Sequence, residues 1–234
     1  LTLSEMLHDQ QHEMAAAETL QALVDLAEQD ETVQRQIANR RGSMGPVLSR
    51  MHFFYAEHFK FAEEPQKVLE HLETAIDADP TDADALIALY RAPGKNVDLD
   101  RRVRSLIRQA AAQFQQQIEL FTRQMDEGHD EEFRQWASAR LASLYNQYAW
   151  LVGNTEGDYD TALRYSHRSL EIRPGTAGYL DTLGRCYYTK GDFANAVKHQ
   201  SQALKRDAHS GLIKRQLDLF QRALDKQQES ARAG

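Results

Sequence analysis

The chain has 234 residues and a formal net charge of −7, with 41% hydrophobic and 27% charged residues. This acidic balance argues against a general affinity for nucleic acid or for an anionic membrane surface. The single cysteine, Cys186, excludes an intrachain disulfide. No run of residues approaches the roughly 20 apolar positions of a membrane-spanning helix.

The N-terminal segment, residues 1–42, predicts a helical hairpin. Within it, residues 3–28 carry apolar or small side chains mostly three or four positions apart, which is typical of one amphipathic helix. A shorter helix is expected over residues 31–41, because cations and Gly42 stand where a helix C-terminus favours them. The sequence leaves open whether this hairpin is a divergent repeat.

The middle of the chain predicts two further pairs of helices. An aromatic-rich helix that starts at Pro46 leads into a hairpin over residues 43–82. Over residues 83–142 the first helix is short, because Ala92-Pro93-Gly94 breaks it. A long amphipathic helix is then expected over residues 98–126, followed by a second long helix. These two should form an elongated antiparallel pair.

Two copies of one pattern follow, in residues 143–176 and 177–208. Gly157-Asp158-Tyr159 recurs 34 positions later as Gly191-Asp192-Phe193. That period is typical of helical hairpins, which cannot bury their apolar faces alone and therefore stack on a neighbour. The first copy needs one extra residue in its turn to keep the match.

Small residues mark the expected contacts within each copy. Ala162 recurs as Ala196, also 34 positions later. At these positions the second helix of a hairpin should approach the first. After the second copy, residues 209–234 predict a helix with one apolar face and a frayed tail, which would cap the stack.

These residues resemble the tetratricopeptide repeat (TPR) family, and the wording of the repeats is similar to bacterial TPR proteins of unassigned function. The family pattern is matched in the second copy by Leu180, Leu183, Gly184, Tyr187, Gly191, Phe193, Ala196 and Ala203. The resemblance covers residues 143–208 strongly and 49–90 weakly. It implies an all-α, right-handed solenoid of helical hairpins, with the elongated pair in the middle and a capping helix at the end.

The resemblance also implies a binding site, because the first helices of TPR hairpins line a concave groove. Transferred to this sequence, the groove positions select ten partner-binding residues: Asn146, Gln147, Trp150, Asn154, Asp181, Arg185, Tyr188, Phe53, Glu57 and Lys60. Amides can bond an extended peptide, and aromatic side chains dominate interface energies. We therefore expect a scaffold that holds a peptide or helix of another protein. That Trp150 and Tyr188 belong to the core between repeats is an open alternative.

Sequence signs of catalysis are missing. There is no Gly-rich phosphate loop, no nucleophile motif and no Cys placed with His and Asp. His8 and His12 stand one helical turn apart, but they lack the order of a zinc-binding helix, and a solvated face explains them better. We predict no metal, no cofactor and no enzyme activity. The chaperone-tail clamp of some TPR proteins is also not expected, since Glu57, Trp150 and Arg185 occupy its positions.

Two alternative functions and the compartment stay open. The chain could be the docking or regulatory part of a larger enzyme or assembly. It could also self-associate through the long pair at residues 98–144, where Phe114 and Phe121 would be exposed. The compartment is unassigned: the cytoplasm is slightly favoured because no signal peptide is seen, and an export signal before Leu1 is the other case.

Overall fold

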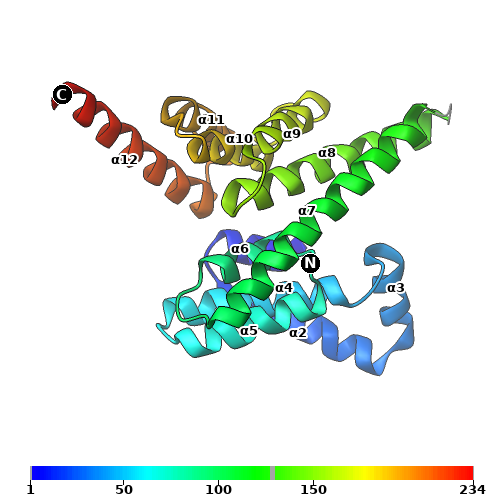
Figure 1. Ribbon diagram of the computed structural model, residues 1–234. Helices are drawn as coiled ribbons and strands as arrows, with labels where there is room; N and C mark the ends of the chain where they lie inside the picture. The colour runs from blue at the N-terminus through cyan, green and yellow to red at the C-terminus, as the bar shows by residue number, and fades with distance from the viewer. Residues whose placement is uncertain (1, 127–129, 234) are drawn as a thin grey trace. The chain divides into compact units, whose positions relative to one another are not determined.

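The computed structural model describes residues 2–126 and 130–233. Within these ranges every regular element is an α-helix (Figure 1). The chain divides into two compact units, which meet in sequence between Ile107 and Arg108. No described helix is both long and apolar enough to cross a membrane.

The first unit is built from short helices around one hairpin. Its elements are α1 (Thr2–Asp9), α2 (Glu13–Gln29), α3 (Glu31–Arg41), α4 (Gly45–Phe61), α5 (Pro65–Ala78), α6 (Ala83–Arg91) and the start of α7 (Val97–Asp126). Helices α4 and α5 form the hairpin, α2 packs on α4, and α6 packs on α5. Phe54, Leu72 and Leu86 are among the fully buried side chains. At the start of α6, the Asp82 carboxylate accepts backbone N–H groups of Asp84 and Ala85.

The prediction of one helix over residues 3–28 is wrong. The chain forms α1 and α2, separated by residues 10–12, and Gln11 has a positive φ of 65°. His8 lies 2.6 Å from the Glu13 carboxylate, and both side chains are buried. Because His12 lies in the break, His8 and His12 do not share a helix face. The apolar spacing continues through the turn, so it gives no sign of the break.

The interruption at residues 92–94 and the long helix behind it are confirmed. Helix α6 ends at Arg91, and α7 begins at Val97 and runs for 30 residues. The first part of α7 belongs to the first unit, where Val103 and Ile107 are fully buried.

The second unit contains the end of α7, two hairpins and a last helix. Its further elements are α8 (Glu131–Asn154), α9 (Tyr159–Ile172), α10 (Ala177–Thr189), α11 (Phe193–Arg206) and α12 (Gly211–Ala233). The end of α7 lies antiparallel to α8, since the Phe121 and Trp136 rings are 5.4 Å apart and Arg140 donates to Gln117 at 3.3 Å. The predicted all-α architecture of helical hairpins with an elongated pair is confirmed.

The two C-terminal hairpins share one turn design. Asp158 and Asp192 cap the second helix of each pair by accepting backbone N–H groups. Gly157 and Gly191 have φ values of 140° and 79°, which side chains rarely adopt. Three residues separate Asn154 from Asp158, whereas two separate Thr189 from Asp192, so the first turn has the extra residue that the sequence predicts.

Helix α12 covers the last hairpin, as predicted for a capping helix. Its Phe220 ring is fully buried and stacks on Tyr188 of α10, with centroids 4.6 Å apart. The buried Gln200 of α11 donates to the Ile213 carbonyl at 3.1 Å. These contacts join α10, α11 and α12 into one layered core.

Gly184 is required where α10 approaches α11. A Cβ at this position would lie 2.8 Å from Gln200 Oε1 and 3.2 Å from the Ala196 carbonyl oxygen. We expect Gly184→Ala to lower the free energy of unfolding by about 1–3 kcal/mol, because the helices must move apart. Urea unfolding followed by circular dichroism measures this.

Gly178 on the same helix provides a matched control. A Cβ there would meet nothing within 4 Å. Gly178→Ala should be neutral or stabilise the protein by up to ~1 kcal/mol, through helix propensity alone. If both variants shift the urea midpoint of unfolding by the same amount, the close approach of α10 and α11 is not the reason that position 184 requires glycine.

Candidate binding surface

Helices α8 and α10 lie side by side with little space between their backbones. The Gly153 carbonyl accepts hydrogen bonds from Arg185 Nε at 3.2 Å and Thr189 Oγ1 at 2.6 Å. A Cβ on Gly153 would lie 3.3 Å from Cys186 Sγ. These contacts join the first helix of one hairpin to the first helix of the next. They also fix the direction in which Arg185 projects.

Arg185 is a half-buried cation without an ion pair among the residues that the structure describes. Its guanidinium carbon lies 5.1 Å from the Tyr188 ring centroid, a cation–π contact. Burial lowers the pKa of Arg185 from its usual value, and nearby Tyr188 and Asp181 offset this only in part. The guanidinium stays protonated at neutral pH. A carboxylate placed beside it would be favoured.

Asp181 and Tyr188 contact α12. The Asp181 carboxylate accepts from the side-chain amides of Gln200 and Gln216. Tyr188 stacks on Phe220 and remains half-buried. The stacking supports the alternative that Tyr188 belongs to the core between repeats.

The sequence matches no family model and no curated protein. Among solved structures, it is similar to the crystal structure of a thermophilic TPR protein from Thermus thermophilus. The identity is 16%, the TM-score is 0.47, and the alignment covers 96% of each chain. At this identity and TM-score, the likeness carries no conclusion about function.

On α8, three of the four predicted residues are half-buried: Asn146, Gln147 and Trp150. Asn154 is only 5% exposed, and its amide donates to the Trp150 carbonyl at 2.9 Å. Asn154 therefore does not line a surface that a partner could contact. The Asn146 Oδ1 atom is buried and has no hydrogen-bond partner in the described part of the chain, so an amide on this helix has unused capacity.

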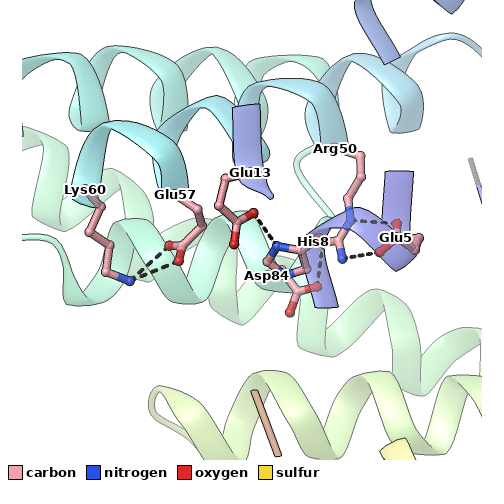
Figure 2. A network of polar contacts seen from close by, with 7 residues as sticks. All are labelled: Glu5, His8, Glu13, Arg50, Glu57, Lys60 and Asp84. Atoms are coloured by element: carbon pink, nitrogen blue, oxygen red, sulfur yellow. Dashed lines mark hydrogen bonds and ion pairs between the residues drawn. The ribbon is translucent and has the colours of Figure 1, made fainter. Parts of the chain in front are cut away.

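The predicted residues of α4 all lie in the first unit. Glu57 and Lys60 form an ion pair on this helix, with 3.0 Å between Oε1 and Nζ (Figure 2). Phe53 is 7% exposed, and the His8 ring lies 5.7 Å from it. The expectation that Phe53 lines an open groove does not fit this burial. Phe53 is covered by α1, which the sequence analysis did not separate from α2.

Two further residues singled out in the sequence are structural. Phe114 is only 5% exposed, so it cannot form the exposed part of a self-association surface. Cys186 is buried, and burial raises the pKa of its thiol to about 12. Its Sγ lies 3.7 Å from the Ala149 carbonyl. Cys186 is thus a packing residue between α8 and α10.

Sequence reasoning missed one polar centre in the first unit. Arg50 of α4 bonds carboxylates on both α1 and α6 (Figure 2). The signal was present in the sequence, since Arg50 stands one turn before the aromatic pair Phe53 and Phe54. A cation on an apolar helix face requires a partner. Its identity could not be read from the sequence, because Glu5 and Asp84 are distant along the chain.

Proposed function

We propose that this chain is a protein-binding scaffold without catalytic activity of its own. Stacked helical hairpins present extended surfaces that suit such binding. We further propose that the surface formed by α8 and α10 holds a peptide or helix whose carboxylate bonds Arg185. The observation that carries the proposal is Arg185 itself: a half-buried guanidinium with no ion pair in the described residues.

The surroundings of Arg185 support an acidic ligand. Its Nε is already bonded to Gly153 O, and Tyr188 covers part of the guanidinium. The nearby Asp181 carboxylate is turned to two amides, Gln200 and Gln216. A ligand carboxylate would therefore meet a partly desolvated cation, where a charge-assisted hydrogen bond is strong. Trp150 and Gln147 on α8 would contribute apolar area and amide contacts.

The test starts from a random-peptide display selection against the full chain. Peptides that survive are synthesised, labelled, and titrated by fluorescence anisotropy. We expect Arg185→Ala to weaken binding by about 10–100-fold, as for an interface hot spot. Replacing the acidic residue of the peptide by its amide should weaken binding to a similar degree.

Arg168 gives the matched control. It lies on α9, is 61% exposed, and pairs with Glu171 at 2.7 Å. Arg168→Ala removes one positive charge, as Arg185→Ala does. Because Arg168 lies on α9 and not on the α8–α10 surface, this variant should leave the affinity for the peptide unchanged. If the two variants bind the selected peptides equally, or if the peptides carry no acidic residue, the proposed surface is wrong.

A further inference from the structure

Helix α1 buries two of its polar side chains and exposes two of its three apolar ones. Ser4 is fully buried and His8 is 6% exposed, whereas Leu3 and Met6 are 58% and 55% exposed. An amphipathic helix of a globular protein normally shows the opposite arrangement. Apolar burial is therefore not the only force that holds α1. Its polar contacts include bonds to α2 and to α4.

The strongest of these contacts is a two-pronged bond between Glu5 and Arg50. Arg50 Nε and Nη2 each donate to one oxygen of the Glu5 carboxylate, both at 2.9 Å (Figure 2). The third prong, Nη1, donates to Asp84 Oδ2 at 2.6 Å. The Arg50 side chain is 18% exposed. Parallel N–H bonds of this kind fix both the position and the orientation of a carboxylate.

The receiving surface belongs to α4 and α6. The Arg50 guanidinium lies 4.9 Å from the centroids of both Phe53 and Phe54. The His8 ring of α1 is 4.9 Å from the Phe54 centroid and tilted by 32°. The Arg50 guanidinium, which binds the carboxylate, thus lies beside the rings of Phe53 and Phe54. Burial acts to lower the pKa of Arg50, but Asp84 and Glu5 outweigh it and raise the pKa.

Helix α1 is short, and its link to α2 is strained. It has eight residues, a length at which an isolated helix is marginal in water. The link to α2 contains Gln11 at a φ of 65°, a left-handed conformation that is costly for a side chain. A buried pair, His8 with Glu13, joins the end of α1 to α2. These features suit a segment that can leave its position.

We propose that the Arg50 face of α4 and α6 is a second binding site, for a short helix of a partner protein that presents a carboxylate to Arg50, and that α1 occupies it in cis. The partner helix would bind as α1 does, with a carboxylate on the Arg50 guanidinium and, one turn later, a flat ring on Phe54. Because α1 is tethered, its effective concentration is high, on the order of millimolar. A partner helix must therefore bind more tightly than α1 to displace it.

The experiment uses the full chain with Glu5→Lys, which sets a cation against Arg50 and releases α1. The probe is a fluorescent peptide of residues 2–12, compared with the same peptide carrying Gln in place of Glu5. Anisotropy should show the Glu5 peptide binding the variant at least about tenfold more tightly than it binds the wild type, where α1 competes. The Gln peptide should bind at least about tenfold more weakly.

Several results would overturn this proposal. Equal affinity of the two peptides would show that Arg50 does not read the carboxylate. Equal affinity of wild type and variant, or no binding to the folded variant at millimolar peptide, would show that α1 does not occupy an exchangeable site. A wild-type dimer that Glu5→Lys converts to a monomer would show that α1 exchanges between copies instead.

A second arm covers the case in which the Lys variant fails to fold. Glu5→Gln keeps the size of the side chain and removes the charge. Hydrogen exchange of the α1 amides should then be at least about tenfold faster than in the wild type, while α2 and α4 stay protected. Glu57→Gln, which breaks the ion pair with Lys60 on α4, is the control and should leave α1 unchanged. Unchanged exchange of α1 in Glu5→Gln would contradict the proposal.

Discussion

Phe220→Ala should destabilise the C-terminal unit by about 3–5 kcal/mol, the cost of emptying a large aromatic site in a core. Phe220 is fully buried and stacks on Tyr188 at 4.6 Å between centroids. It anchors α12 on the last hairpin. Without it, the apolar face of α10 would be open to water. Urea unfolding followed by circular dichroism should show the loss, and hydrogen exchange should show α12 released first.

Leu219 is the control beside it. It is 42% exposed on the same turn of α12. Leu219→Ala should cost less than about 1 kcal/mol, because an exposed side chain makes few contacts. If the two variants unfold at the same urea concentration, α12 is not a cap that depends on Phe220.

The second large effect is expected at Arg50. Arg50→Ala leaves the carboxylates of Glu5 and Asp84 without their shared cation. We expect the free energy of unfolding of the first unit to fall by about 3 kcal/mol. The value lies at the low end for a broken buried pair, because the Glu5 and Asp84 side chains are 46% and 35% exposed and water screens them. Thermal or urea unfolding measures the change.

An exposed ion pair in the same unit serves for comparison. Arg35 and Glu31 on α3 are 74% and 88% exposed and 3.8 Å apart. Arg35→Ala should change the stability by less than ~0.5 kcal/mol. A comparable loss in both variants would mean that net charge, not the Arg50 guanidinium, controls stability.

The C-terminal hairpins could be predicted from the sequence because their signals are local. Gly157 and Gly191 permit the positive φ of each turn, and the Asp that follows each caps the next helix. The small residue Ala196 lies where α10 and α11 approach, against Gly184. Each of these roles depends on neighbours within about one repeat, so spacing along the chain reveals them.

The features that escaped prediction depend on contacts between distant segments. The break at residues 10–12 accompanies a pair between His8 and Glu13 and the placement of α1 over α4. Hydrophobic spacing continues across this break. Phe53 is buried because α1 covers it. Asn154 is the last residue of α8, and its side chain bonds the Trp150 carbonyl of the same helix. The repeat pattern does not specify this contact.

The predicted groove residues show the same difference between local signals and contacts with distant segments. Arg185 was selected by its position in the repeat, and the structure places it half-buried without an ion pair in the described residues. Tyr188 was selected by the same rule but contacts the capping helix. A repeat pattern gives the face of a helix on which a residue lies. It does not give what packs against that face.

Hydrogen exchange with a selected acidic peptide tests the central proposal most directly. We predict added protection in α8 over residues 145–154 and in α10 over residues 177–189 when the peptide is bound to the full chain. The same peptide should give no added protection to Arg185→Ala at equal concentration. Protection confined to α9 and α11, or protection that persists in Arg185→Ala, would contradict the proposal that Arg185 and the α8–α10 surface hold the partner.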